Sequence, residues 1–264
     1  MKKKTKNVKK NPESVWFGKE RVTPDKKTAL VDGVFSSVAK NYDIMNDLMS
    51  IGMHRIWKNI FVSDICASMN ASAKKIKVLD LAGGTADIAI KLYGMSMAKA
   101  AVTVCDINEQ MLEYGKAKVV NSGILSGIDF VLGNAEKLRF EDCSFDYVVI
   151  SFGIRNVARI DTALSDIFRV LKPGGQFFCL EFSSGVDPKF KYGYDLYCDV
   201  VLPFLGTHVA KDREAYEYLA KSIQSFPNQE SFAKRISKAG FSDVKWKNLF
   251  SGIAVEHYGI KKCK

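Results

Sequence analysis

The chain has 264 residues and 47% hydrophobic content, enough to bury one large core, so we expect a single globular domain with additions. It has no apolar run long enough to span a membrane, and its Lys-rich start lacks the apolar segment of a signal peptide. The net charge of +10 is uneven, because residues 1–27 carry ten Lys and Arg residues against three acidic ones.

Residues 1–27 are therefore predicted to form a basic, flexible N-terminal arm. The alternatives are an anchor on anionic lipid and a contact to a partner protein. Basic and aromatic residues are not interleaved as in nucleic-acid-binding modules, so we expect no nucleic-acid partner. We expect a cytoplasmic protein. If the arm does anchor on anionic lipid, the protein would contact the inner face of the membrane peripherally.

The cysteines and histidines do not predict a metal site. The six cysteines are scattered without a C-x-x-C pair, and the chain has only three histidines. This pattern is typical of reduced thiols in a protein without a bound metal.

Short apolar runs alternate with amphipathic stretches between residues 74 and 183. This alternation predicts βαβ units and a parallel sheet. The expected strands are 76–81, 101–105, 129–132, 147–151 and 176–182, and the expected helices are 87–93, 109–120 and 160–171. The sequence Lys172-Pro173-Gly174-Gly175 is predicted to stop the last of these helices and to turn the chain into the next strand.

The C-terminal part predicts a helix at 229–238 followed by two strands, 244–249 and 252–258, joined as an antiparallel hairpin. The fold predicted from the pattern is thus α/β, with a seven-stranded, mostly parallel sheet. Residues 28–264 form one domain in this interpretation. Residues 28–70 and 184–227 fall outside the sheet pattern and are predicted to be a helical lid and a substrate insert.

The first strand of the sheet ends in the turn Leu81-Ala82-Gly83-Gly84-Thr85. In open α/β sheets, ligands bind outside the carboxyl ends of the strands, and Gly83 and Gly84 let the backbone approach a ligand closely. A dinucleotide fingerprint would need glycines at positions 82, 84 and 87, and only Gly84 meets it. Because a carboxylate at Asp87 also suits a pyrophosphate poorly, the turn favours a cofactor without phosphates.

Polar residues at the ends of the following strands outline that cofactor. Asp106 is placed to accept hydrogen bonds from ribose hydroxyls, with a helix N-cap as its alternative role. The pair Asn134-Ala135 would lie against an adenine edge, and Ser151 would face the same crevice. A sulfonium amino acid would then lie near three residues of the first turn, and the predicted cofactor is S-adenosyl-L-methionine. Those three residues are Asp80, Gly83 and Thr85.

Two longer stretches carry a resemblance to a known family. They are 42–50 (YDIMNDLMS), and 169–175 (RVLKPGG) with 180–183 (LEFS). Together with 79–85 (LDLAGGT) and 151–157 (SFGIRNV), they resemble the ubiquinone/menaquinone biosynthesis C-methyltransferase family (UbiE type), from about residue 34 to residue 258.

The resemblance implies a Rossmann-like class I methyltransferase fold that binds S-adenosylmethionine. It also implies C-methylation of a polyprenylated benzoquinol or of demethylmenaquinol. The family's cofactor contacts fall here on Thr85, Asp106, Asn134, Ala135 and Ser151. One residue departs from the family pattern: Ala86 stands where glycine is usual, and the expectation is that its methyl tightens the turn while alanine favours the helix start.

Methylation of a ring carbon is easier when a hydroxyl of the quinol loses its proton. A phenol of pKa about 10 needs roughly 4 kcal/mol of preferential stabilisation to be ionised at neutral pH. We assign this electrostatic role to Arg155 and Asn156, and a proton relay to Tyr42 or a water molecule. An ion pair at the surface is the alternative for Arg155, and a core aromatic is the alternative for Tyr42. His54 and His208 are rival proton carriers without an assigned role.

Two other functional classes remain open from the sequence. One is a Rossmann-type oxidoreductase, which the missing glycines disfavour. The other is a non-catalytic, S-adenosylmethionine-binding subunit of a quinone-biosynthesis assembly. The expected partner is the polyprenylated quinol, and a homodimer or a complex of quinone-biosynthesis proteins is left open.

Overall fold

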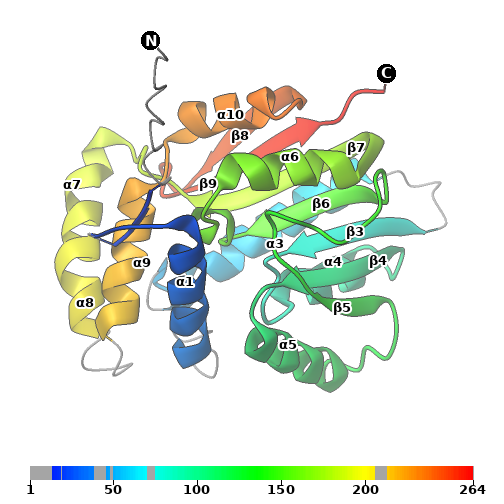
Figure 1. The fold of residues 1–264 in the computed structure, drawn as a ribbon, viewed down its shortest axis with the longest axis horizontal. Helices are drawn as coiled ribbons and strands as arrows, with labels where there is room; N and C mark the ends of the chain where they lie inside the picture. The colour runs from blue at the N-terminus through cyan, green and yellow to red at the C-terminus, as the bar shows by residue number, and fades with distance from the viewer. Residues whose placement is uncertain are drawn as a thin grey trace, which may run out of the picture.

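The computed structural model describes residues 14–18, 20–38, 46–47, 50–69, 75–205 and 213–263. At its centre is a seven-stranded sheet with the order β5-β4-β3-β6-β7-β9-β8 (Figure 1). The strands are β3 (Ile76–Leu81), β4 (Ala100–Asp106), β5 (Ile128–Leu132), β6 (Phe145–Ser151), β7 (Leu171–Phe182), β8 (Ser242–Leu249) and β9 (Ala254–Ile260).

The first five of these strands are parallel, and β9 pairs antiparallel with both β7 and β8. The predicted seven-stranded, mostly parallel sheet with a C-terminal antiparallel hairpin is therefore confirmed. The strand order reverses between β3 and β6, because the chain runs outward from β3 to β5 and then returns to the other side of β3. Ligands bind at such a switch point in open α/β sheets.

Helices cover both faces of the sheet (Figure 1). On one face, α3 (Met53–Ser68), α4 (Asp87–Met95) and α5 (Glu109–Asn121) pack against side chains such as Val78 and Val149. On the other face, α6 (Ile160–Val170) and α10 (Gln229–Lys238) pack against neighbours such as Leu79 and Val148. Both faces are apolar because successive side chains of a strand point to opposite sides and helices cover both sides.

The sequence Lys172–Gly175 forms a bulge within β7 instead of a turn before it. Helix α6 ends at Val170 and β7 begins at once, with Leu171 opposite Phe145 and Gln176 opposite Tyr147. The intervening residues bulge out of the ladder, and Gly174 has a φ of +80°, which glycine adopts without strain. The predicted helix stop is thus correct, but strand pairing resumes earlier than expected.

Ordered elements begin within the segment predicted to be a flexible arm. Strands β1 (Val15–Phe17) and β2 (Glu20–Val22) form an antiparallel hairpin, and α1 (Pro24–Val38) follows it. Lys27 of α1 is buried, and its Nζ donates to the backbone oxygens of Arg155 and Val157 at 3.4 and 3.3 Å. Residues 24–27 therefore pack with the domain, and residues 1–13 lie outside the described part of the chain.

The predicted insert is mostly helical where the structure describes it. It contains α7 (Pro188–Leu196), a π-helix η3 (Tyr197–Val201), α8 (Leu202–Leu205) and α9 (Arg213–Ser225), which are grouped at the left in Figure 1. None of the helices in the described ranges is long and apolar enough to cross a membrane. Tyr42 and His208 lie outside the described residues.

Asp87 joins three helices on one face of the sheet. Its carboxylate lies 2.8 Å from Nζ of Lys58 on α3 and also pairs with Lys118 on α5. Burial alone would raise the pKa of Asp87, but the charges and hydrogen bonds of the two lysines outweigh it and hold the pKa well below 3.8. The Lys58 side chain is only 6% exposed, so the carboxylate compensates a charge that is largely out of water.

We expect Asp87→Asn to lower the free energy of unfolding by about 2–4 kcal/mol at pH 7, because Lys58 loses its partner. A carboxyl group with a lowered folded-state pKa stabilises the fold above its ordinary pKa and loses this contribution as the pH falls. The difference in free energy of unfolding between the wild type and the variant should therefore become smaller below about pH 4, which denaturant titrations at several pH values would measure. The control is Glu113→Gln, which breaks an exposed pair with Lys116 and should cost less than about 1 kcal/mol. An Asp87→Asn deficit equal to that of the control would contradict this interpretation.

Candidate functional site

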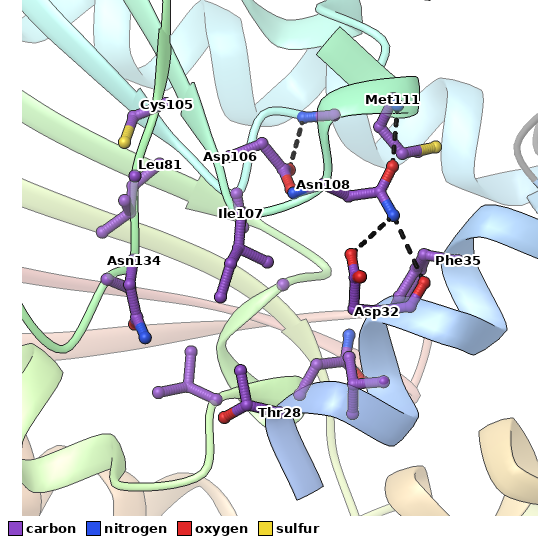
Figure 2. A pocket seen from close by; sticks show the side chains of 18 of the residues that line it. Thr28, Asp32, Phe35, Leu81, Cys105, Asp106, Ile107, Asn108, Met111 and Asn134 are labelled. Atoms are coloured by element: carbon purple, nitrogen blue, oxygen red, sulfur yellow. Dashed lines mark hydrogen bonds between the residues drawn. The ribbon is translucent and has the colours of Figure 1, made fainter. Parts of the chain in front are cut away.

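A cavity opens at the carboxyl ends of β3, β4 and β6, beside the point where the strand order reverses (Figure 2). Its empty volume is about 760 Å³, part of which is open to solvent. Helix α1 forms one wall through Thr28, Val31, Asp32 and Phe35, so part of the predicted lid does border the site. The remaining lining residues come from the last residues of β3 and β4, from the segments that follow the strands and from the start of α5: 81–82, 84, 105–108, 111, 133–136, 152–153 and 156–158.

The glycine turn after β3 has no room for a side chain at its centre. A Cβ on Gly83 would lie 2.8 Å from Cγ1 of Val104 and 2.9 Å from Oδ2 of Asp80. Gly84 has a φ of +50°, and its N–H donates to Oδ2 of Asp106 at 2.9 Å. The turn therefore exposes bare backbone to the cavity, and glycine is needed at 83 for space and at 84 for conformation.

Asp106 receives one backbone hydrogen bond on each carboxylate oxygen. Gly84 donates to Oδ2 and Asn108 donates to Oδ1, both at 2.9 Å. Burial raises the pKa of Asp106, and these N–H bonds partly offset the rise. Each oxygen keeps a lone pair, so the carboxylate can still accept from two hydroxyls.

The helix cap that was the alternative role of Asp106 belongs to Asn108. Oδ1 of Asn108 accepts from N–H of Met111 at 2.8 Å and caps α5. Its Nδ2 donates to Oδ1 of Asp32 at 2.8 Å, which ties α1 to α5 (Figure 2). It also donates to Oγ of Ser36 on α1 at 2.8 Å. Asn108 thus joins the cavity wall to the residue predicted to bind ribose, although sequence reasoning did not select it. Its position directly before the helix start was the signal that could have identified it as the cap.

Asn134 and Ala135, which are predicted to border the adenine, both line the cavity. Oδ1 of Asn134 accepts from N–H of Glu136 at 2.8 Å and shapes the loop. Glu136 in turn pairs with Arg159 at 3.0 Å. The loop after β5 is therefore held in place from two sides.

Four of the predicted cofactor residues are not among the residues that line the cavity: Asp80, Gly83, Thr85 and Ser151. Burial raises the pKa of Asp80 to about 8, although N–H of Ala89 and the charge of Lys58 act in the opposite direction. Within the described residues, neither carboxylate oxygen of Asp80 nor Oγ of Ser151 makes a hydrogen bond of normal geometry. A buried carboxyl without a partner is costly, and a bound ammonium group would remove that cost. These orphaned groups and the bare glycine turn fit a cofactor with a charged amino-acid end.

The residues after the turn differ in two respects from the sequence interpretation. Ala86 has a φ of +63°, so it occupies the left-handed region directly before α4. The expectation that alanine favours the helix start is therefore wrong at this position, since this conformation costs an L-residue roughly 1–2 kcal/mol. The Asp87 carboxylate does not line the cavity but pairs with two lysines, so its charge is no argument against a phosphate-bearing ligand.

Arg155 is an ion-paired residue, but the pair is buried and not at the surface. Its Nη1 lies 2.9 Å from Oε1 of Glu181, and the two side chains are 2% and 1% exposed. Its Nε donates to Oγ of Ser222 at 3.3 Å. Arg155 does not line the cavity, whereas its neighbour Asn156 does. Direct contact between Arg155 and a substrate oxygen stays a prediction.

His54 is buried and does not line the cavity. Its Nδ1 lies 2.9 Å from Oγ of Ser50. Burial lowers the pKa of His54 to about 4, so the ring is neutral near pH 7. This environment matches a structural histidine.

Comparisons with known proteins agree with this geometry. The model of the ubiE/COQ5 methyltransferase family matches residues 22–261. Over 245 residues the chain is 50% identical to a Bartonella tribocorum protein named ubiquinone/menaquinone biosynthesis C-methyltransferase UbiE, with 93% of each chain covered. A Brucella canis protein of the same name is 46% identical, with 93% of this chain and 90% of that one covered.

Solved structures show the same fold at low identity. A methyltransferase of Thermotoga maritima that depends on S-adenosylmethionine has a TM-score of 0.61 at 19% identity, with 88% of this chain and 100% of that one covered. Phosphoethanolamine N-methyltransferase 2 of Haemonchus contortus, solved with S-adenosylhomocysteine, has a TM-score of 0.57 at 17% identity, with 78% and 52% covered. The predicted class I methyltransferase fold is confirmed. By the extent of the family match and the identity to these relatives, the chain is a methyltransferase and belongs to the ubiE/COQ5 methyltransferase family.

Proposed function

We propose that this enzyme transfers a methyl group from S-adenosyl-L-methionine to a ring carbon of a polyprenylated quinol in ubiquinone or menaquinone biosynthesis. The acceptor is 2-polyprenyl-6-methoxy-1,4-benzoquinol, demethylmenaquinol or both. The observation that carries the proposal is that one cavity reaches from Asp106 to Asn156. It therefore borders both the predicted ribose site and the predicted acceptor site. The names of the relatives at 46–50% identity support the same reaction.

The residues of the cavity suit each part of the cofactor. Asp106 would accept from the ribose hydroxyls, and Asn134 with Ala135 would border the adenine. The amino-acid end would lie against Gly83 and Gly84, where the orphaned carboxyl of Asp80 would meet its ammonium group. When bound, the cofactor supplies an electrophilic methyl group on a sulfonium. Thr85 and Ser151, which lie behind the lining, would support the same end of the site.

On the acceptor side, the protein must favour the ionised form of a phenol-like hydroxyl. Arg155 contributes positive charge, but Glu181 neutralises much of it within the buried pair. Asn156 faces the cavity and offers a hydrogen-bond donor at the ring oxygen. Tyr42 or a water molecule relays the proton in this proposal. Alignment of ring carbon, methyl and sulfur supplies the rest of the rate enhancement.

The other proposed partners follow from the substrate. A polyprenylated quinol partitions into lipid, so contact of the basic segment 1–27 with anionic membrane at its inner face would bring the enzyme to its substrate. A homodimer or an assembly with other quinone-biosynthesis proteins remains compatible with this proposal. No observation favours the non-catalytic alternative over the enzyme.

We expect the purified protein to methylate at least one of the two quinols at a ring carbon, which mass spectrometry of the product would show. Asp106→Ala should lower kcat/KM by at least about 100-fold, because the ribose loses both acceptors. The control is Asp129→Ala, which removes an exposed carboxylate of β5 outside the cavity lining and should leave the rate unchanged. Tight binding of S-adenosylhomocysteine without transfer to either quinol would favour the non-catalytic subunit instead.

Binding of S-adenosylhomocysteine at pH 7 should release about one proton from the protein. The pKa of Asp80 is about 8, so its carboxyl is mostly protonated at this pH, and an ammonium partner favours the ionised form. Affinity should accordingly rise between pH 6 and pH 8. Calorimetry in two buffers of different ionisation enthalpy measures the proton count.

Asp80→Asn should abolish the proton release, because the amide has no proton to lose. Glu256→Gln is the matched control, since burial also raises the pKa of Glu256 to about 8 but this residue lies on β9, three strands away from β3 in the sheet. If the control and not Asp80→Asn removes the release, the amino-acid end of the cofactor does not meet Asp80.

A further inference from the structure

A tyrosine of the insert holds the polar residue that faces the acceptor end of the cavity. Asn156 ends the short 3-10 helix η2 (Ile154–Asn156) after β6 and lines the cavity. The hydroxyl of Tyr218, on α9, donates to Oδ1 of Asn156 at 3.1 Å. These two residues are 62 positions apart in the sequence, so only the tertiary structure brings them together.

Tyr218 is itself held firmly. Its side chain is buried, and its ring stacks on Phe17 of β1 with a centroid distance of 4.5 Å and an interplanar angle of 23°. One turn further along α9, Oγ of Ser222 accepts a hydrogen bond from Nε of Arg155, which lies in the same loop as Asn156. The N-terminal hairpin and α9 thus fix the loop at two consecutive residues, Arg155 and Asn156.

The hydrogen bond decides which atom of the Asn156 amide is available to a ligand. Because Oδ1 accepts from Tyr218, the two N–H groups of Nδ2 remain for other partners. Burial raises the pKa of Tyr218, and the charge of Arg155 only partly offsets this, so the hydroxyl keeps its proton and stays a donor at neutral pH. The hydrogen bond to Tyr218 therefore favours an orientation of the Asn156 amide in which Nδ2, a donor, is available to a ligand.

We propose that Tyr218 is a positioning residue for methyl transfer, which holds the Asn156 amide so that Nδ2 donates a hydrogen bond to the acceptor oxygen as negative charge develops there. This inference rests on the proposed function and adds to it the group that orients the donor. A donor fixed before the reaction stabilises developing charge without reorganising in the transition state. Its effect therefore falls on the chemical step and not on cofactor binding.

The variant that tests this is Tyr218→Phe, which keeps the ring that stacks on Phe17 and removes only the hydroxyl. We expect kcat to fall about tenfold, against the roughly 100-fold or larger loss expected when the Asn156 amide itself is removed. The KM for S-adenosylmethionine should stay within about twofold, since the cofactor contacts are intact.

Tyr147→Phe is the matched control. Its hydroxyl donates to the backbone oxygen of Ser68 at 2.9 Å, and Tyr147 does not line the cavity. Both variants lose one part-buried hydrogen bond of a tyrosine, so their melting temperatures should fall by similar amounts. Only Tyr218→Phe should lower kcat. Equal kcat in the two variants would overturn the inference.

A double-mutant cycle tests whether Tyr218 acts through Asn156. In an Asn156→Ala background, Tyr218→Phe should cause no further loss of kcat, because the group that it orients is gone. A further tenfold loss in that background would show that the two residues act independently, and would also overturn the inference. If the wild-type enzyme methylates neither quinol, the proposed function itself fails and the inference falls with it.

Discussion

The backbone turn between β3 and α4 is the constraint on which the site depends. Its centre lies so close to Val104 and Asp80 that only glycine fits at position 83. The next residue, Gly84, directs its N–H to Asp106, and Asp106 also binds the N–H of Asn108. From Asn108 the hydrogen bonds continue to α5 and to α1. One tight turn therefore positions Asp106, the carboxylate proposed to bind ribose, and, through Asn108, the α1 wall of the cavity.

The buried ionisable groups of this protein differ in whether a partner of opposite charge compensates them. Arg155 and Glu181 compensate each other within the core, and Asp87 is compensated by two lysines. Asp80 has no such partner, and its raised pKa reflects the cost of ionising it there. Such a group lowers the stability of the unliganded protein, so its position behind the cofactor cavity is best explained by a ligand that carries positive charge.

The insert and the N-terminal hairpin support the loop on the proposed acceptor side of the site. Through α9 the insert contacts Arg155 and Asn156, while Phe17 of the hairpin supports Tyr218. The fold thus separates two tasks. Loops at the sheet edge and α1 form the cavity, whereas α9 and the N-terminal hairpin hold the loop of Arg155 and Asn156 in place.

Local patterns were enough to locate the sheet and several of the residues that line the cavity. Strand β3 and helix α10 have the predicted bounds, because their apolar periodicity and end signals lie within the segment itself. Asp106, Asn134 and Ala135 line the cavity because parallel strands bring their carboxyl ends to one edge, which strand order alone implies. The hairpin of β1 and β2 was missed, since three-residue strands carry too little periodicity to be recognised.

The sequence by itself determined the fold class, the family resemblance and the edge of the sheet where the cavity lies, because each follows from neighbouring residues or from the order of strands. Only the tertiary structure decided that Asn108 and not Asp106 caps α5, that Arg155 is paired with Glu181 in the core, and that Tyr218 is hydrogen-bonded to Asn156. The last two relationships join residues 26 and 62 positions apart. Such contacts leave no local periodicity, since they depend on how separate elements pack together.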